Sequence, residues 1–523
     1  MNVKIKRALL SVTNKTGIVD VAKALISHGV EIISSGGTAK HLQAENIPVT
    51  PIEKVTGNPE AFGGRMKTIS FQIGSALLFR RDNAEDVNTA NELGIGPIDL
   101  VICNLYPFAE VVKNGGTYDE MIENIDIGGP TMIRAAAKNH RHVTVLTSPD
   151  QYQDFLKSYL SLNGETEFGL RQRFALKAFE LMALYDATVA QQLAKVAEQT
   201  LQTQIISPLQ ASTLRYGENP HQKGYVVSNS IETGLASIVP LQGKELSYNN
   251  LLDADAAWRS VVDLHNRCHQ NFKFGVSIIK HSTPCGMALS DCQLNALENA
   301  WSGDPVSSFG GIIAFNQKVE ADVAQFFQDK FIEVILAPDF EDSALKIFST
   351  KKNVRVLKVP MVDALPGPMI RSIFGGFVMQ EEDNGVAPKI EQVTKLKFSP
   401  SLESLIPFGL ITCKHLKSNA ISLVKMSSRG PILIGAGMGN PNRLVSVEQA
   451  VNKAIENGHT DLSDAVLVSD AFFPFPDTVE CAHKFGIRNI IQPGGSIKDQ
   501  EVIARADELT VAMVFTGMRH FRH

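Results

Sequence analysis

Hydrophobic and polar positions alternate in blocks along the first 147 residues of the chain. Short apolar runs typical of buried strands occur at 7–12 (RALLSV), 31–34 (EIIS), 99–106 (DLVICNLY) and 142–147 (HVTVLT). Between the first two runs, and again before the last, the stretches 17–29 and 129–140 carry apolar residues at helical spacing. Strands that alternate with helices predict a parallel sheet with helices on its faces.

The pattern changes after residue 150. Residues 150–202 keep a continuous helical spacing, which predicts a helical connector or cap. Two prolines and a glycine then interrupt the pattern, at positions 208, 220 and 217. We therefore place a domain boundary near residue 200, which divides the chain into domains 1–200 and 201–523.

Strand and helix patterns alternate again in the second domain, so the whole chain belongs to the α/β class. Segments that carry motifs recur near 275–315 and 410–475, which favours two subdomains, although no short-period repeat is evident. The polar stretch 381–400 is interpreted as a loop or connector. A length of 523 residues is too great for a single core, in agreement with this division.

Composition and charge narrow the classes of function. With 44% hydrophobic and 20% charged residues, the chain has the balance of a soluble globular protein, and its net charge of −5 argues against non-specific binding to nucleic acid or anionic membranes. The six cysteines form no CxxC pair, so neither a disulfide framework nor a zinc ribbon is predicted, and a reducing cytoplasm fits best. No apolar run has the length of a signal-peptide core or a membrane span.

Two segments rich in hydroxyl groups follow the first two predicted strands. The first, SVTNKTG at 11–17, contains Ser11 and Lys15, and the second, SSGGT, spans 34–38. Hydroxyls, a lysine and free backbone amides at a helix N-terminus form an anion site. Either segment alone is more often a simple helix cap, but two of them at successive strand ends favour a shared phosphate pocket. The spacing of a Walker loop is absent.

Lys280 and His281 end the apolar run FGVSII of the second domain. Thr283-Pro284 and Gly286 then predict a turn. Taken alone, such a pair is more often a surface lysine beside a hydrogen-bonded histidine. A cation and a titratable imidazole at a strand end nevertheless suit a catalytic site.

Two familiar cofactor motifs are incomplete in the second domain. The segment GAGMGN at 435–440 lacks the third glycine of a dinucleotide-binding loop. The segment PCGMA at 284–288 lacks the second cysteine of a zinc deaminase, and no HxE motif accompanies it. We therefore predict neither a nucleotide cofactor nor a metal.

Several phrases of the first domain resemble the bifunctional 5-aminoimidazole-4-carboxamide ribotide (AICAR) transformylase/IMP cyclohydrolase family. They are SVTNKTG, SSGGTAKHL, GGRMKT, CNLYPF, IDIGGPTMIRAAAKNH and RHVTVL. In that family the N-terminal fold is similar to methylglyoxal synthase. The resemblance implies cyclohydrolase residues at Lys67, Tyr106, Asp126 and Lys138. It implies phosphate and substrate contacts at Ser11, Lys15, Ser35, Gly37, Thr38, Arg65, Thr68 and Asn104.

The resemblance continues to the C-terminus through LRYGENPHQ, LSYNNLLDADAAW, IIKHSTPCG, DPVSSFGG, KSNAI, IGAG, SDAFFPF, QPGG and FTGMRHFRH. It implies a transformylase region of cytidine-deaminase-like α/β subdomains with a docked C-terminal tail. Catalytic residues are implied at Lys280, His281 and Asn419. Substrate or folate contacts are implied at Arg215, Tyr216, Phe309, Glu333, Arg443, Phe472 and Arg519.

The resemblance implies two reactions of de novo purine biosynthesis. A formyl group passes from 10-formyltetrahydrofolate to AICAR, and formyl-AICAR then closes to IMP with loss of water. The partners implied are small molecules, AICAR and folate, with no nucleic acid, membrane, metal or nucleotide cofactor. A cytoplasmic homodimer is implied, with each transformylase site built from both chains.

The chain departs from the family pattern at three places. After GGRMKT the family continues with histidines, whereas residues 69–74 read ISFQIG. Pro476 replaces a frequent arginine, and residues 438–441 lengthen the loop before Arg443. The missing histidines keep an alternative open, in which the chain is a single-activity AICAR transformylase whose N-terminal domain only binds a regulatory nucleotide.

Overall fold

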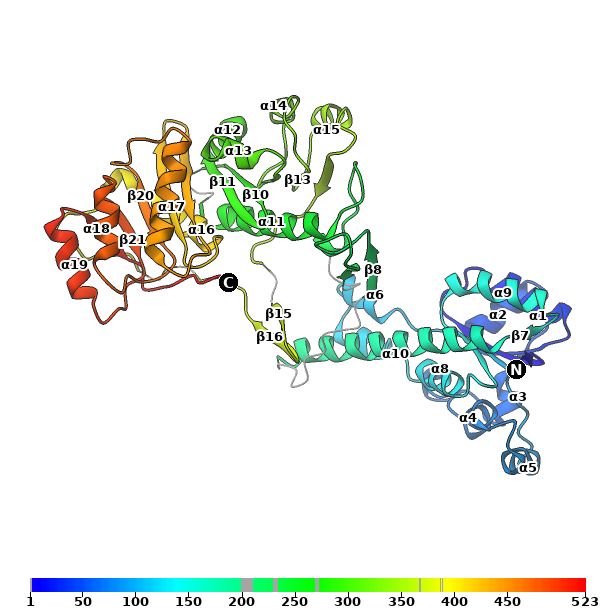
Figure 1. Cartoon of the computed structure of the whole chain (residues 1–523). Helices are drawn as coiled ribbons and strands as arrows, with labels where there is room; N and C mark the ends of the chain where they lie inside the picture. The colour runs from blue at the N-terminus through cyan, green and yellow to red at the C-terminus, as the bar shows by residue number, and fades with distance from the viewer. Residues whose placement is uncertain are drawn as a thin grey trace. The chain divides into compact units, whose positions relative to one another are not determined.

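A computed structural model describes residues 2–198, 210–228, 234–268, 272–365, 368–385, 387 and 389–523. The described residues up to Gln210 form one compact unit, unit 1, and those from Ala211 onward form a second, unit 2. Both combine helices and strands (Figure 1). Among the described residues, no helix has the length and apolar character needed to cross a membrane.

Unit 1 is built on a five-stranded sheet in the order β4-β3-β2-β5-β6, and all of its strand pairs are parallel. The strands are β2 (Arg7–Val12), β3 (Glu31–Ser34), β4 (Thr50–Pro51), β5 (Leu100–Asn104) and β6 (Thr144–Leu146). Successive residues point to opposite faces, so Leu9 joins one buried cluster and Leu10 the other. The parallel sheet predicted for the first domain is confirmed.

Helices cover both faces of this sheet. Residues of α1 (Ile18–Ser27) and α9 (Tyr152–Ser161) pack into the cluster that contains Leu10, and residues of α4 (Phe71–Leu78) and α8 (Gly128–Lys138) pack into the other. The long helix α10 contributes to both clusters. The remaining helices are α2 (Gly36–Ala44), α3 (Ile52–Thr56), η1 (Phe62–Gly64), α5 (Ala84–Glu92), α6 (Phe108–Lys113), α7 (Tyr118–Glu123) and η2 (Pro149–Gln151).

The helical spacing of 150–202 is not continuous in the structure, because two helices separated by a short strand occupy this stretch. Helix α9 ends before Asn163 and Gly164, whose φ angles of 50° and 84° reverse the chain. The short strand β7 (Glu165–Thr166) then pairs with β1 (Val3–Lys4) before α10 (Phe168–Val196) begins. Residues 199–202 lie outside the described part of the chain.

Unit 2 contains an eleven-stranded sheet in the order β14-β13-β12-β10-β11-β19-β18-β20-β21-β22-β17. Its first five strands in sequence are β10 (Phe274–Lys280), β11 (Thr283–Ser290), β12 (Ile312–Phe315), β13 (Val334–Ala337) and β14 (Arg355–Lys358). The others are β17 (Glu391–Gln392), β18 (Ile421–Ser427), β19 (Gly430–Gly437), β20 (Val466–Ser469), β21 (Asn489–Gln492) and β22 (Ala512–Phe515). Among the described residues of the polar stretch 381–400, β17 is the one strand.

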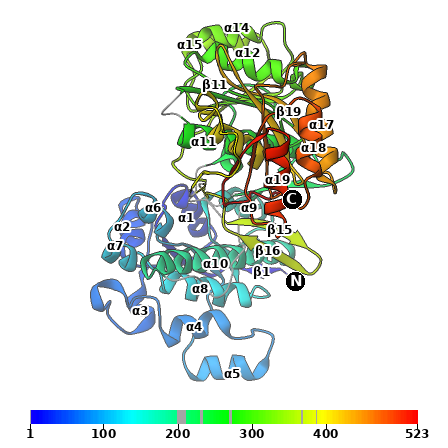
Figure 2. The same cartoon turned by 90° about the vertical axis from the view of Figure 1, so that its left-hand side faces the viewer.

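The sheet is an internal duplication. In each half a helix leads into an antiparallel hairpin, and three parallel strands with intervening helices follow. The first half uses α11 (Tyr248–Cys268), α12 (Gln293–Gly303), α13 (Pro305–Ser308), α14 (Ala321–Phe326) and α15 (Asp342–Ser349). The second half uses α16 (Leu405–Lys414), α17 (Arg443–Glu456), α18 (Asp477–Lys484) and α19 (Asp499–Glu508). Helix α17 packs on β19 and lies beside α18 (Figure 2).

The halves meet where β11 pairs with β19, and glycines let a helix approach each of these strands. A Cβ atom on Gly286 of β11 would lie 1.9 Å from the carbonyl oxygen of Ala300 in α12. The same atom on Gly437 of β19 would lie 1.8 Å from the carbonyl oxygen of Ser446 in α17. The GAG segment therefore lies within a strand and serves helix packing.

Two hairpins and the C-terminal tail complete unit 2. β8 (Gln210–Leu214) pairs with β9 (Gly224–Ser228), and β15 (Met369–Ile373) pairs with β16 (Gly376–Gln380). Short helices η3 (Leu235–Ser237) and η4 (Pro400–Leu402) lie in the connections. The expected docking of the tail is confirmed, because the Arg522 carbonyl accepts the Ser418 N–H at 2.8 Å and the His520 N–H donates to the Asp470 carbonyl at 2.9 Å.

Candidate active sites

A cavity of about 600 Å³ lies at the carboxyl ends of β2, β3 and β5 in unit 1. Carboxyl ends of parallel strands share one edge of the sheet, so loops distant in sequence meet there. Of the twelve residues predicted for this domain's site, eleven line the cavity. They are Ser11, Lys15, Ser35, Gly37, Thr38, Arg65, Lys67, Thr68, Asn104, Tyr106 and Asp126.

Two lysines converge on the first turn of α2, at one side of this cavity. A Cβ atom on Gly36 would lie 3.5 Å from the Nζ of Lys67, and one on Gly37 would lie 3.8 Å from the Nζ of Lys15. Gly36 has a φ of +53°, which suits glycine. Ammonium groups and free amides at a helix N-terminus together bind an anion such as a phosphate.

Two of the predicted contact residues shape the cavity wall. The Thr38 hydroxyl is buried, accepts the Val12 N–H and donates to the Val12 carbonyl, both at 2.9 Å. The Asn104 side-chain oxygen accepts the N–H groups of Thr13 and Asn14 at 2.6 and 2.9 Å. These side chains therefore hold the loop after β2 in place beside the lysines.

Asp126 lies where the chain enters α8. Its Oδ1 accepts the Gly129 N–H at 2.8 Å, and a Cβ atom on Gly129 would approach Oδ2 to 2.7 Å. Burial raises the pKa of Asp126 above its ordinary value, although backbone N–H groups of Gly129 and Tyr106 act in the opposite direction. A raised pKa makes a carboxylate a stronger base and lets it hold a proton at a higher pH than an exposed aspartate does.

Charged pairs flank the cavity. The Lys67 ammonium lies 2.9 Å from Glu60, a residue that the sequence did not single out, and Arg65 pairs with Glu123 at the exposed rim. Tyr106 is 44% exposed and borders the same space as Asp126. The cavity therefore presents cations at one wall and proton-exchanging groups at another.

Lys138 is the predicted cyclohydrolase residue that does not line the cavity. It is exposed at the C-terminal end of α8, whereas Gly129 near the other end of this helix borders the cavity. The rise of a helix separates these two positions by about 14 Å along its axis. Ser70, at the place of a missing histidine, also lies outside the cavity and accepts the Ile73 N–H at 3.1 Å as the cap of α4.

In unit 2, Lys280 and His281 stand at the β10–β11 turn. His281 and Ser282 have φ angles of 53° and 58°, so these two residues form the turn. The prediction of a turn at Thr283-Pro284 is therefore wrong, because Thr283 already begins β11.

Asp253 of α11 holds this turn, and sequence reasoning did not identify it. Its carboxylate accepts the N–H of His281 at 3.1 Å and that of Ser282 at 2.6 Å. These bonds stabilise two consecutive left-handed residues that would otherwise be unfavourable. The signal was present in the LSYNNLLDADAAW phrase, but no pattern linked that helix to the turn.

Lys280 and His281 border a cavity of about 200 Å³, together with Asp304 and Lys453. The Lys280 ammonium donates to the Phe309 carbonyl at 2.8 Å, which fixes its direction. The Phe309 ring is 57% exposed and lies beside Phe331.

Apart from Phe309, the other predicted transformylase residues line two further cavities within unit 2. Arg215, Tyr216 and Glu333 line one of about 360 Å³, which also contains Lys244 and Arg355. Asn419, Arg443, Phe472 and Arg519 line one of about 460 Å³. The structure therefore distributes these residues over three cavities.

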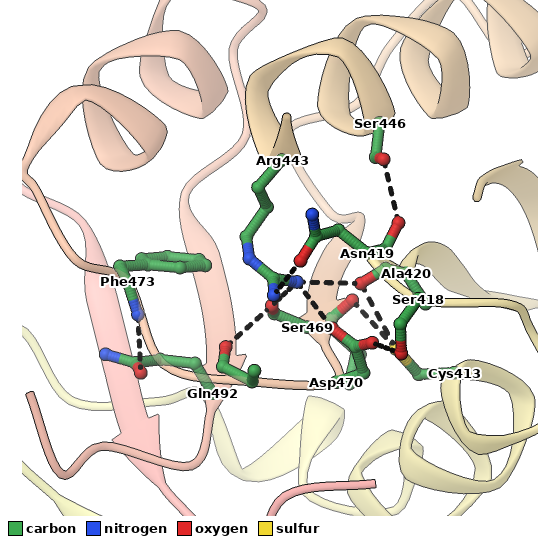
Figure 3. A network of polar contacts seen from close by, with 12 residues as sticks. Cys413, Ser418, Asn419, Ala420, Arg443, Ser446, Ser469, Asp470, Phe473 and Gln492 are labelled. Atoms are coloured by element: carbon green, nitrogen blue, oxygen red, sulfur yellow. Dashed lines mark hydrogen bonds and ion pairs between the residues drawn. The ribbon is translucent and has the colours of Figure 1, made fainter. Parts of the chain in front are cut away.

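Arg443 is engaged by the protein itself (Figure 3). Its buried guanidinium pairs with Asp470 and donates to Ser469 at 2.9 Å and to the Asn419 side-chain oxygen at 2.8 Å. The Asn419 amide nitrogen donates in turn to the carbonyls of Asn440 and Pro441 at 2.9 and 3.1 Å. These bonds hold Arg443 beside Asn419, and both residues line the same cavity.

A buried polar cluster supports the C-terminal tail. The His415 Nε2 lies 2.7 Å from Asp263, its Nδ1 lies 3.1 Å from an Arg522 nitrogen, and Lys414 lies 2.8 Å from Asp263. Burial lowers the pKa of His415 to about 4, against the raising effect of Asp263. Although burial alone would raise it, the hydrogen bond and charge of His415, with those of Lys414, hold the pKa of Asp263 below its ordinary value.

Within the part of the chain that the structure describes, no three His, Cys, Asp or Glu side chains are grouped so that they could hold a metal ion.

Comparisons with known proteins find matches in both units. A family described as the AICARFT/IMPCHase bienzyme matches residues 136–453, and an MGS-like domain matches residues 17–131. The bifunctional purine biosynthesis proteins PurH of Persephonella marina and Petrotoga mobilis are each 43% identical to the chain, over 99% of its length and 100% of theirs. A solved structure described as "Crystal structure of ForH" is 33% identical and matches 36% of this chain and 97% of its own, with a TM-score of 0.33.

Proposed function

The chain belongs to the AICARFT/IMPCHase bienzyme family, and from this membership we propose how its residues divide two reactions. It is a bifunctional enzyme of purine biosynthesis, an AICAR formyltransferase and IMP cyclohydrolase. Relatives named bifunctional match its full length, which favours this function over a single-activity transformylase with a regulatory N-terminal domain.

Our first proposal is that ring closure occurs in unit 1. The observation that carries it is that a paired-lysine anion site and the partly buried carboxyl group of Asp126 line one cavity. The ribotide phosphate would bind at the first turn of α2 between Lys15 and Lys67. The base would then extend toward Tyr106 and Asp126.

Ring closure joins the carboxamide nitrogen of formyl-AICAR to its formyl carbon and releases water. The attacking nitrogen must lose a proton, and the leaving oxygen must gain protons. Asp126, with its raised pKa, suits such transfers, and the Tyr106 phenol can donate to the formyl oxygen. Because both reacting groups belong to one bound molecule, their alignment supplies much of the acceleration.

Formyl transfer is assigned to unit 2, at the β10–β11 turn. The amine of AICAR is a weak nucleophile because its lone pair is delocalised, so a base must remove its proton as the bond forms. His281 is exposed at the cavity and suits this role. Lys280, whose ammonium retains two further hydrogens beyond its bond to Phe309, can stabilise the developing oxyanion or protonate the departing folate nitrogen.

The co-substrate of the family is formyltetrahydrofolate, and we propose the 10-formyl isomer, with no metal or nucleotide cofactor in either step. Asn419, Phe472 and Arg519 share a cavity that offers an amide, a ring and a cation for this ligand or AICAR. We also propose a cytoplasmic location, which the six free cysteines support.

We further propose a homodimer that completes the transformylase site. Arg215 and Tyr216 line a different cavity from Lys280 and His281, although one ribotide would need its phosphate bound by the former while its amine meets the latter. A second copy can bring the Arg215 cavity of one chain to the His281 cavity of the other. Arginine at that position suits a phosphate, since its fork binds two oxygens.

Mixing two inactive variants tests this arrangement. Arg215→Ala and His281→Ala should each lack formyl transfer, and a hybrid dimer should regain it, because one of its two sites would carry neither change. Light scattering would report the assembly, and the appearance of IMP from AICAR and 10-formyltetrahydrofolate would report the activity. A mixture that exchanges subunits and stays inactive would place both residues within a single chain's site.

A further inference from the structure

Helix α10 reaches the entrance of α8, and one hydroxyl group joins them. The Tyr185 Oη of α10 accepts the backbone N–H of Asp126 at 2.6 Å and donates to the Asn124 carbonyl at 3.4 Å. Arg134 of α8 also pairs with Asp186, the next residue of α10. The chain that leads into Asp126 is therefore tied to a helix that contributes no residue to the cavity wall.

Tyr185 also contacts the other proton-exchanging segment. Its ring packs edge-on against Phe108, with ring centroids 6.4 Å apart. Phe108 follows Tyr106 by two residues and is itself buried. One side chain thus supports both segments that bring Tyr106 and Asp126 to the cavity.

We propose that Tyr185 is a positioning residue for ring closure, which holds Asp126 through its backbone and Tyr106 through the Phe108 ring. The inference rests on the proposed catalytic role of Asp126. Tyr185 itself does not line the cavity, so it acts through these groups without touching the substrate. Helix α10, which the sequence suggests is a connector, is by this inference part of the cyclohydrolase machinery.

The hydroxyl bond matters because displacement of the Asp126 loop would expose its carboxyl group. Burial is the main cause of the raised pKa of Asp126, so a looser loop would lower this pKa toward its ordinary value. Cys103 at the end of β5 and Tyr185 are the titratable groups coupled to Asp126, while Lys67 and Tyr106 share its cavity. Burial raises the pKa values of Cys103 and Tyr185, so neither gains charge where a carboxyl group titrates.

The test replaces Tyr185 by phenylalanine in the full-length protein, which removes the oxygen and keeps the ring. With formyl-AICAR as substrate, Tyr185→Phe should lower kcat of ring closure about 10-fold with little change in KM, because the substrate contacts remain. The inflection of the pH profile that Asp126→Asn abolishes should move to lower pH. Formyl transfer should be unchanged.

Two variants separate positioning from general loosening. Tyr159→Phe makes the same chemical change on a buried hydroxyl of α9 that has no hydrogen-bond partner among the described residues, and it should leave kcat and the pH profile unchanged. Arg134→Gln breaks the α8–α10 ion pair and spares the hydroxyl bond. It should leave the position of the inflection unchanged.

Each outcome decides the matter. If Tyr185→Phe matches Tyr159→Phe, or if Arg134→Gln shifts the inflection equally, the inference is overturned. Should Tyr185→Phe fold poorly, hydrogen exchange of the unmodified protein decides, because an unprotected Asp126 amide would contradict the bond. If Asp126→Asn retains full ring closure, the proposed role of Asp126 fails, which is distinct from failure of Tyr185 alone.

Discussion

The two units bring their predicted site residues together to very different degrees. In unit 1, eleven of twelve such residues line one cavity at the edge of a short parallel sheet. In unit 2, nine of the ten predicted residues are spread over three cavities of a unit whose duplicated sheet has eleven strands. The difference shows that a parallel sheet gathers distant loops at a single edge, whereas the long sheet of unit 2 keeps the predicted residues apart.

The key groups of the two units also have opposite environments. Asp126 is partly buried, and the removal of water shifts its pKa. His281 is exposed on a turn that a carboxylate holds in a left-handed conformation. Burial thus sets the pKa of Asp126, whereas the backbone conformation of the turn sets the position of His281.

The largest expected effect is a clean separation of the two reactions. His281→Ala should reduce formyl transfer by about 10²–10⁴-fold and leave ring closure intact, because a general base contributes on that order. Asp126→Asn should do the reverse. The measurements are formylation of AICAR and closure of separately prepared formyl-AICAR. A variant that loses both activities while remaining folded would contradict the assignment of one reaction to each unit.

A smaller loss is expected when the support of the His281 turn is removed. Asp253→Ala leaves the N–H groups of His281 and Ser282 without their carboxylate, so the imidazole should be misplaced and kcat of formyl transfer should fall about 10–100-fold. Asp255→Ala, two residues further along α11, is a control that keeps the turn bonds. Equal losses in both variants would show that the helix, and not the turn, is responsible.

The buried cluster of unit 2 predicts a pH dependence of stability. The folded pKa of His415, about 4, lies below its ordinary value of 6.5, so the unfolded chain binds the proton first as pH falls. The free energy of unfolding should therefore decrease between about pH 6.5 and pH 4, by on the order of 1–3 kcal/mol. The lowered pKa of Asp263 extends this loss to still lower pH.

Replacement of His415 by glutamine tests this dependence, because glutamine can donate to Asp263 without titrating. Melting temperatures measured at pH 7 and pH 5 should differ less in His415→Gln than in the parent. The exposed His221→Gln variant should retain the parental difference. Parallel curves for His415→Gln and the parent would place the titration elsewhere.

The smallest effect is expected at Lys138. Since its side chain is exposed at the far end of α8 from the cavity, Lys138→Ala should keep ring closure within about threefold of the parent, as for a surface site. Kinetics with formyl-AICAR provide the measurement. A loss comparable to that of Asp126→Asn would instead mean that Lys138 reaches a cavity of another chain. The ring-closure site of unit 1 would then also need a residue from a second copy.

The spacing of apolar residues predicted those helices and strands in which buried positions follow a regular pattern. The parallel sheet of unit 1 was predicted from β2, β3, β5 and β6, because each of these strands lies in a short apolar run. The break between α9 and α10 was missed, since Asn163-Gly164 is a two-residue signal within a long helical spacing. For unit 2, recurring motifs near 275–315 and 410–475 indicated two subdomains, but the joining of both halves into one continuous sheet was not predicted, because no sequence period records it.

Most of the residues that the sequence identified line cavities, but few of the residues that hold them in place were identified. Lys280 and Asp126 were found because whole phrases around them match a family. Asp253, Tyr185 and Asp470 act through backbone groups or other side chains far away in sequence. No local pattern records such contacts, because they depend on how helices pack after the chain has folded.

The continuous sheet of unit 2 has a consequence for how this unit denatures. β11 and β19 are interior strands that pair at Ala288 and Ile432, so parting the two halves would turn both into edge strands. Such an edge invites pairing with other chains and aggregation. Heat should therefore melt the two halves in one concerted calorimetric transition, despite their repeated architecture, and any half that opened alone would be prone to precipitate.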